Sequence, residues 1–300
     1  MTLTLYNSGK DSRIGAMDFA IRRVVRIFPL YLLVFFALFI AAASAGVGGP
    51  EGFEPTLTNF VWNALLLPRD DLTTYMPVSA WTLTHELMFY TICIVGFFSK
   101  RLFWFLLGLW SAACLIYFVW EGSIKNLAML LSPLNIYFLL GVLCAALFRV
   151  HKDTNSMLWL STGFIMLTCA ILVETAVFSA GQRTIYDAIL YAISFFALTF
   201  AMATLKTSNQ SLLARVMDYF GKISYALYLL NFPIIVAVAM IVARFETGLI
   251  GQIIFVLISI SASLIASTLS FKLIESPGIA IGRMVANKVT SRATSATAPV

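Results

Sequence analysis

Long apolar stretches recur along the whole chain of 300 residues. Most of them reach the ~20 residues that an α-helix needs to cross a hydrocarbon core about 30 Å thick. A segment in lipid must satisfy its own backbone hydrogen bonds, so apolar runs of this length fold as helices. The predicted spans are residues 27–46, 79–98, 102–120, 130–148, 157–178, 184–204, 223–243 and 249–271.

The composition is that of a membrane protein. Hydrophobic residues make up 60% and charged residues 11% of the chain, and the mean hydropathy is +0.91. Soluble domains have about 45–50% apolar and about 25% charged residues. We therefore predict an all-α fold, a polytopic transmembrane helix bundle of about eight spans. Four cysteines lie inside spans at irregular separations, which favours packing over metal binding: Cys93, Cys114, Cys144 and Cys169.

The distribution of Lys and Arg predicts the topology. A further apolar stretch, Leu57–Leu67, is too short to cross the bilayer, so we interpret it as interfacial or re-entrant. With a cytoplasmic N-terminus, sixteen of the twenty basic residues then fall on the cytoplasmic face, whereas a crossing at Leu57–Leu67 would divide them almost evenly. Because cytoplasmic loops carry the basic excess, we expect both termini in the cytoplasm. The net charge of +6 reflects this topology and attraction to anionic lipid, and predicts no nucleic-acid partner.

The same pattern divides the chain into three parts. Residues 1–26 are predicted to form a cytoplasmic N-terminal segment, residues 27–277 the transmembrane domain, and residues 278–300 a cytoplasmic, disordered tail. The first twenty residues lack the features of a signal peptide.

Ionisable residues inside a span are costly and by default indicate function. Glu86, in the segment WTLTHELMFY, is the clearest example. Helical spacing places Glu86 and Tyr90 on one face, with Phe89 beside them and His85 turned about 100° away. A buried Glu86 would be poised for proton transfer, and His85 could act as an acid or a base near neutral pH. The alternative is a carboxylate that joins two helices by pairing with Arg or Lys.

Two further groups of polar residues lie at or inside the spans. Arg22, Arg23 and Arg26 stand at the cytoplasmic mouth of the first span, where they could bind phosphate or simply anchor the helix. Tyr225, Tyr228 and Asn231 form a polar stripe before Pro233, which suits either substrate contact or helix association.

Glu275, in FKLIESP, lies at the cytoplasmic end of the last span. We expect it to form a structural ion pair with the arginine cluster on the same side.

The segments RRVVRIFPLY, WTLTHELMFY, ISYALYLLNFP and LIESP together resemble, in order and rough spacing, the acyltransferase-3 family of integral membrane acyltransferases. The second segment is most similar to the exopolysaccharide acetyltransferase branch. The resemblance implies transfer of an acyl group, usually acetyl from acetyl-CoA, to a hydroxyl of a cell-surface polysaccharide or glycolipid. It implies a multi-pass protein of the bacterial inner membrane, with acyl-CoA as co-substrate and no bound cofactor. The other expected partners are the glycan or lipid-linked sugar acceptor and membrane lipid.

Residue by residue, Arg23 and Arg26 match the family's R-x-x-R on the CoA side, and Glu86, Phe89 and Tyr90 match its E-x-x-F-Y. We therefore predict Glu86, Tyr90 and His85 as catalytic residues, of which His85 is suggested only by its place beside Glu86. The predicted substrate-binding residues are Arg23, Arg26 and Phe89, from the resemblance, and Tyr225, Tyr228 and Asn231, from the polar stripe.

The chain departs from the family pattern in two places. Family members open with two further helices, which carry a basic residue and the histidine regarded as the catalytic base, and neither residue has a match here. Asn231 stands where many relatives have histidine, and an amide is no proton acceptor near neutral pH.

We therefore expect an N-terminally incomplete acyltransferase or a partner chain that supplies the two helices. The alternatives are a non-catalytic protein that binds or moves an envelope lipid or glycan, and an inactive remnant.

Overall fold

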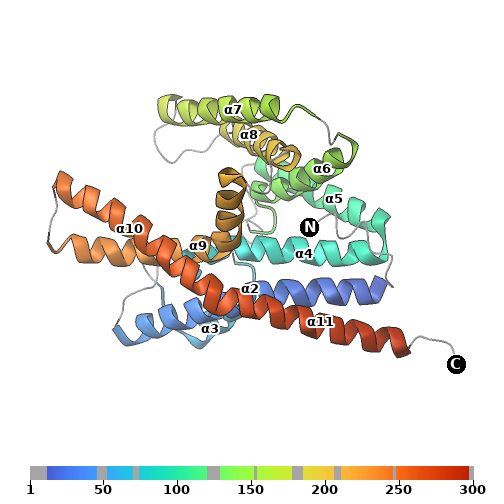
Figure 1. The fold of residues 1–300 in the computed structure, drawn as a ribbon, viewed down its shortest axis with the longest axis horizontal. Helices are drawn as coiled ribbons and strands as arrows, with labels where there is room; N and C mark the ends of the chain where they lie inside the picture. Colours follow the sequence, from blue (N-terminus) through green and yellow to red (C-terminus); the bar gives the residue numbers. More distant parts are fainter. Residues whose placement is uncertain are drawn as a thin grey trace. The chain divides into compact units, whose positions relative to one another are not determined.

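The computed structural model describes residues 12–45, 53–69, 74–119, 129–151, 154–177, 185–205, 211–245 and 248–296. In these ranges all regular secondary structure is helical (Figure 1). The long helices are α2 (Ser12–Ala45), α4 (Trp81–Phe98), α5 (Lys100–Val119), α6 (Ile136–Val150), α7 (Ser156–Val177), α8 (Ile185–Thr204), α9 (Leu212–Val242), α10 (Leu249–Ser270) and α11 (Ser276–Ala296). The short ones are α3 (Leu57–Ala64), η2 (Val78–Ala80), η4 (Pro133–Asn135) and the π-helical turn η5 (Phe271–Glu275).

The predicted all-α membrane fold is confirmed. Seven helices in the described ranges are long and apolar enough to cross a membrane, and Ile189–Thr204 of α8 is a shorter apolar helix. All eight predicted spans coincide with one of these helices. The stretch at Leu57–Leu67 contains only the eight-residue helix α3, in keeping with a segment too short to cross.

The chain divides into two compact units. The smaller unit contains α5 from Trp104 onward, with α6, α7 and α8. In it α8 packs against both α7 and α6. The larger unit contains α2, α3, α4, α9 from Arg215 onward, α10, η5 and α11, and every site residue predicted from the sequence lies in it.

Helix α2 is the centre of the larger unit, because it contacts α4, α11, η5 and α3. Figure 1 shows α4, α2 and α11 running side by side. Small residues allow the approach of α11: a Cβ atom added at Gly282 would meet the Val25 side chain at 3.1 Å, and one at Gly278 would meet the Val25 carbonyl oxygen at 3.6 Å. Pro29 of α2 lacks the N–H that would bond this carbonyl in a regular helix, so α11 covers a backbone group left open.

A buried asparagine connects the segment around α3 to α2, beside aromatic contacts of Phe60 with Phe35 and Phe39. The Asn63 side chain donates to the carbonyl oxygens of Asn59 and Thr74, both at 2.9 Å, and accepts from the Met76 N–H at 2.8 Å. Its own carbonyl accepts from the Tyr31 hydroxyl of α2 at 2.6 Å. Asn63 is 1% exposed, so these bonds satisfy polar groups that water does not reach. They fix the chain that leads into η2 and α4.

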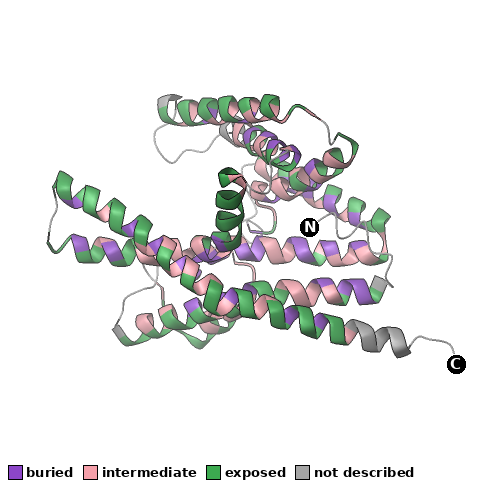
Figure 2. Ribbon diagram, in the orientation of Figure 1, coloured by how far each residue is buried: buried purple, intermediate pink, exposed green. Residues whose placement is uncertain are grey.

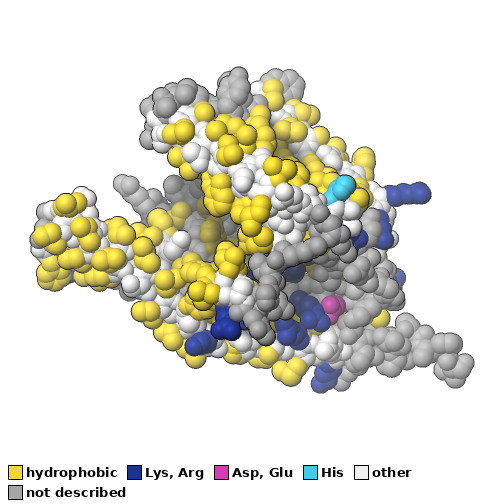
Figure 3. Space-filling model, turned by 45° about the horizontal axis from the view of Figure 1, so that its top comes forward, with side chains coloured by type: hydrophobic (Ala, Val, Ile, Leu, Met, Phe, Trp, Pro, Cys, Tyr) yellow, Lys and Arg dark blue, Asp and Glu magenta, His cyan; other side chains and the backbone are white. Residues whose placement is uncertain are grey.

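The surface of the described helices is largely apolar. Figure 2 shows mostly exposed residues along α10, and Figure 3 shows hydrophobic side chains over the α9–α10 arm at the left of the view. In water such a surface would be unfavourable, but a bilayer accommodates it. The exposed residues of this arm include Met240, Ile241, Phe245, Leu249, Ile250, Ile253, Leu257 and Ile260.

Two of the predicted boundaries differ from the structure. The last 23 residues were expected to be disordered, but α11 runs from Ser276 to Ala296, and only residues 297–300 lie outside the described ranges. Contact with α2 through small residues accounts for this helix despite its low hydropathy. At the other end, α2 begins at Ser12, so no helix boundary separates residues 1–26 from the first span.

Candidate functional site

Arg23 of α2 packs against two aromatic rings that also contact each other. Its guanidinium carbon lies 5.2 Å from the ring centroid of Phe19 and 5.1 Å from that of Tyr90 of α4. The two rings meet edge to face with centroids 5.6 Å apart. Cation–π contacts of this kind fix the orientation of an arginine while its donors remain available. The Arg23 Nη1 group also donates to the Tyr90 hydroxyl oxygen at 3.5 Å.

Tyr90 connects this arginine to Glu86. The Tyr90 hydroxyl donates a hydrogen bond to Glu86 Oε1, across the i, i+4 spacing that the sequence predicted to share a face. The guanidinium, the phenol and the carboxylate therefore form one hydrogen-bonded series from α2 to α4. The alternative in which Glu86 pairs directly with Arg or Lys is not what the structure shows, because Tyr90 lies between the two charges.

Arg26, Tyr225 and Glu275 form a second group beside this series. Arg26 is exposed, and its charge interacts with the Glu275 carboxylate and with the phenols of Tyr90 and Tyr225. The Tyr225 hydroxyl donates to the Ile27 carbonyl oxygen of α2 at 2.6 Å. The expected direct ion pair of Glu275 with the arginine cluster is absent from the described part of the chain, where no Arg or Lys nitrogen lies within 4.0 Å of its carboxylate.

The other two residues of the predicted polar stripe differ in what they contact. The Tyr228 hydroxyl bonds Thr82 Oγ1 at 2.6 Å and the Ser79 carbonyl at 3.0 Å, so it joins α9 to the start of α4. Asn231 is partly exposed, and its side chain makes no hydrogen bond to another described residue. Tyr228 thus has a structural role, whereas the Asn231 amide remains available to a ligand.

His85 and Phe89 are both buried, at 4% and 5% exposed. The His85 ring meets the Trp81 ring edge to face with centroids 5.4 Å apart.

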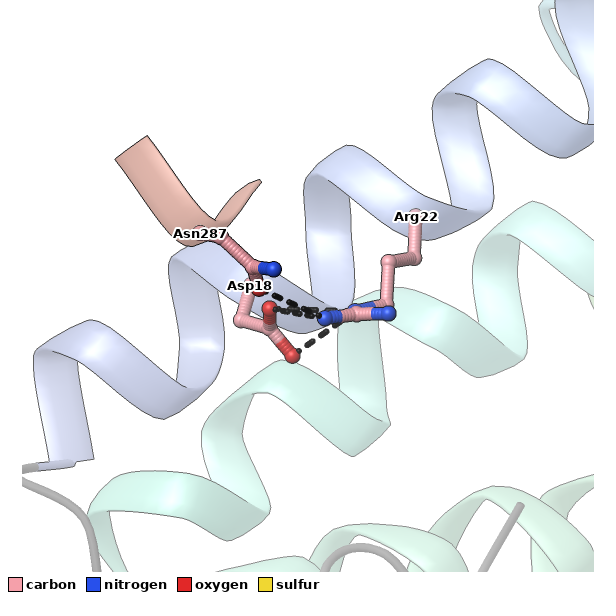
Figure 4. Close-up of polar contacts among 3 residues, drawn as sticks. All are labelled: Asp18, Arg22 and Asn287. Atoms are coloured by element: carbon pink, nitrogen blue, oxygen red, sulfur yellow. Dashed lines mark hydrogen bonds and ion pairs between the residues drawn. The ribbon is translucent and has the colours of Figure 1, made fainter. Parts of the chain in front are cut away.

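Arg22 does not belong to the same arrangement as Arg23 and Arg26. Its guanidinium forms an ion pair with Asp18 at 2.9 Å, and Nη2 reaches Asn287 Oδ1 of α11 at 3.5 Å (Figure 4). Of the two alternatives given for these arginines, anchoring of the helix therefore describes Arg22 better than phosphate binding. Partly exposed pairs of this kind contribute only about 0–1 kcal/mol to stability.

Sequence reasoning missed several residues at the site. Phe19 lies one turn before Arg23, and this i, i+4 spacing was a usable signal. The Ile27 carbonyl, which accepts from Tyr225, has no signal in the sequence.

In the smaller unit, the carboxylate of Glu174 accepts from the Tyr191 hydroxyl at 2.5 Å, and both residues lie inside predicted spans. This second phenol and carboxylate pair was not singled out.

The arrangement suits proton transfer and anion binding. Two arginines can bind phosphate oxygens, and a carboxylate with a hydrogen-bonded phenol can accept a proton from a hydroxyl. Among the described residues no group of three His, Cys, Asp or Glu side chains could hold a metal ion.

Comparison with known proteins gives the family. The model of the acyltransferase domain family known as acyltransferase-3 matches residues 4–271 of the 300. The chain therefore belongs to the acyltransferase-3 family of membrane acyltransferases, as the four motifs predicted. Neither the curated proteins nor the solved structures gave a match.

Proposed function

We propose that this protein transfers an acyl group, acetyl in the simplest case, from acyl-CoA to a hydroxyl of a cell-surface polysaccharide or glycolipid. The observation that carries the proposal is the hydrogen-bonded series from Arg23 through Tyr90 to Glu86, within a chain of an acyltransferase family. The series joins an anion-binding group to a proton-accepting group across two helices.

Arg23 and Arg26 are proposed to bind the phosphates of acyl-CoA. Arg23 is pre-oriented by Phe19 and Tyr90, so little side-chain entropy is lost when its planar donors meet a phosphate. Arg26 is exposed and lacks an ion-pair partner within the described ranges. The proposed topology places these arginines at the cytoplasmic face of the inner membrane. Because acyl-CoA is made in the cytoplasm, it could reach them there.

Glu86 is the proposed base. As the acceptor hydroxyl attacks the thioester carbonyl carbon, its proton passes to the Glu86 carboxylate, a C–O bond forms, and the C–S bond breaks. The proton returns to the departing sulfur, so that an ester and free CoA thiol are the products. The Tyr90 hydroxyl orients the carboxylate, while Phe89 borders it and Asn231 is available to the acceptor. His85 remains the second candidate for the base, with its orientation set by Trp81.

Label transfer from acyl-CoA tests the proposal. Inverted membrane vesicles that contain the protein receive acetyl-CoA labelled in the acetyl group, and alkali-labile label is counted in the glycan and lipid fractions. We expect Glu86→Gln to lower the rate by about 100-fold or more, in the range that general acid–base groups contribute. Glu174→Gln is the matched control, since it alters another phenol-bonded carboxylate inside a span. Binding of glycolipid without acyl-CoA dependence would instead indicate the non-catalytic carrier.

Acyl-CoA binding provides the second arm of the test. Arg23→Gln with Arg26→Gln should abolish saturable binding of labelled CoA. The control is Arg215→Gln with Arg283→Gln, which removes two exposed arginines of the same unit and keeps the net charge equal to that of the first variant. Equal binding by the two double variants would mean that general positive charge, rather than this site, attracts CoA.

A further inference from the structure

Glu275 is a buried carboxylate that the proposed transfer does not use. It is 4% exposed, and its Oε1 atom has no hydrogen-bond partner in the part of the chain that the structure describes. Burying a carboxylate is costly unless hydrogen bonds or an opposite charge compensate. A buried oxygen of this kind needs a donor, and no residue in the described ranges provides one.

The π turn accounts for the position of Glu275. Pro277 has no N–H, so the Leu273 carbonyl cannot receive the usual i+4 bond. The helix widens instead, and the Ser276 N–H bonds the Phe271 carbonyl five residues earlier. The extra residue in this turn directs Glu275 toward α2 and α9 and away from the exposed side on which Lys272 and Leu273 lie. Single π turns inside helices occur frequently at functional sites.

The described neighbours of Glu275 bury Oε1 without donating a hydrogen bond to it. Its carboxylate interacts with the Arg26 charge and with the backbone of Ala226 in α9. The nearby Tyr225 hydroxyl donates its hydrogen bond to the Ile27 carbonyl, so it does not donate to Glu275. Arg26 is too far away for an ion pair. Arg26 therefore places a cation at the exposed side of this group of residues, and Glu275 Oε1 places a hydrogen-bond acceptor at its buried side.

We propose that Glu275 Oε1 accepts a hydrogen bond from the pantetheine arm of acyl-CoA. This inference rests on the proposed function, in which Arg26 binds the CoA phosphates. In acyl-CoA the diphosphate is followed along the arm by a hydroxyl and an amide N–H, so donors come directly after the anions. A carboxylate repels phosphate and accepts from O–H and N–H groups. Arg26 and Glu275 together therefore fix the direction in which the arm enters the bundle.

Paired ligands test this role. Dissociation constants are measured by equilibrium dialysis on the full chain in detergent for CoA and for 3′-phosphoadenosine 5′-diphosphate, which has the phosphates but no arm. Glu275→Gln should weaken CoA binding about tenfold, as for loss of a charge-assisted hydrogen bond, and leave the nucleotide within about twofold. Arg26→Gln should weaken both ligands. Glu174→Gln serves as the matched control and should change neither.

An equal loss for both ligands in Glu275→Gln would overturn the inference, because it would show that Glu275 acts only through Arg26 or through folding. Unchanged CoA binding would overturn it as well. Glu275→Asp keeps the charge but withdraws the carboxylate by one methylene, so it should weaken CoA alone even if the Gln variant fails to fold. Wild-type protein that binds neither ligand would contradict the proposed function itself, an outcome distinct from any selective effect at Glu275.

Discussion

The Tyr90 hydroxyl stands between the guanidinium of Arg23 and the carboxylate of Glu86, and bonds both. Two opposite charges on different helices are thereby coupled without direct contact. A phenol in this position can donate to the carboxylate and still accept from the guanidinium. Its orientation thus depends on whether Arg23 is occupied, which would link phosphate binding on α2 to the state of the proposed base on α4.

Tyr90→Phe should separate CoA binding from acyl transfer. The ring remains, so the cation–π contact with Arg23 and CoA affinity should change by less than about threefold. The hydroxyl is lost, so the rate of acyl transfer should fall about tenfold, the equivalent of one hydrogen bond of about 1.4 kcal/mol. Steady-state kinetics and CoA binding on the same preparation measure both. A loss of affinity with an unchanged rate would contradict this assignment.

Asn63→Leu should destabilise the larger unit. The leucine cannot accept from the buried Met76 N–H or donate to the Thr74 carbonyl. Unsatisfied buried groups of this kind cost about 1–3 kcal/mol, so the thermal unfolding midpoint in detergent should fall by several degrees. Asn59→Ala is the control, because among the described residues its side chain bonds only the Glu54 carbonyl, at an exposed position. Equal shifts for both variants would show that Asn63 is not the principal fastening of α3.

Gly282→Leu should separate α11 from α2. Even a Cβ atom would lie 3.1 Å from Val25, and a leucine adds three further carbons at a site without space. Overpacking of this kind costs about 1–3 kcal/mol. Gly221→Leu is the matched control, since an added Cβ there meets nothing within 4 Å. Nanodisc samples heated in parallel should show a lower midpoint for the Gly282 variant only, and a shift in both would point to a general effect of leucine.

Single cysteines test the proposed topology. Arg101→Cys and Arg244→Cys are introduced into a chain without its native cysteines, and both positions are exposed. With both termini in the cytoplasm, a membrane-impermeant maleimide should label the cysteine at 244 in intact spheroplasts and the cysteine at 101 only after lysis. The reverse pattern would show that the protein has the opposite orientation in the membrane, with Arg23 on the side away from cytoplasmic acyl-CoA.

The helices could be predicted because their length and hydrophobicity are set by the bilayer and not by a particular packing partner. The pairing of Glu86 with Tyr90 followed from spacing within one helix. The contact of Arg23 with Tyr90 joins residues 67 positions apart and depends on how α2 packs against α4, which a single sequence does not specify.

The segment after the last span differs from its prediction for another reason. It was predicted to be a disordered tail. In the structure Pro277 is accommodated by the π turn, and α11 continues because Gly278 and Gly282 allow it to lie on Val25. Periodicity methods assume a constant 3.6 residues per turn, so they cannot detect an added residue.

The π turn absorbs one residue without moving the helix beyond it. Removal of one residue between 271 and 275 would make the bond from the Ser276 N–H to the Phe271 carbonyl an ordinary i+4 bond, so Gly278 and Gly282 would still face Val25. Among natural variants we therefore expect a one-residue deletion here to leave the contact of α11 with α2 intact and to redirect only side chains inside the turn.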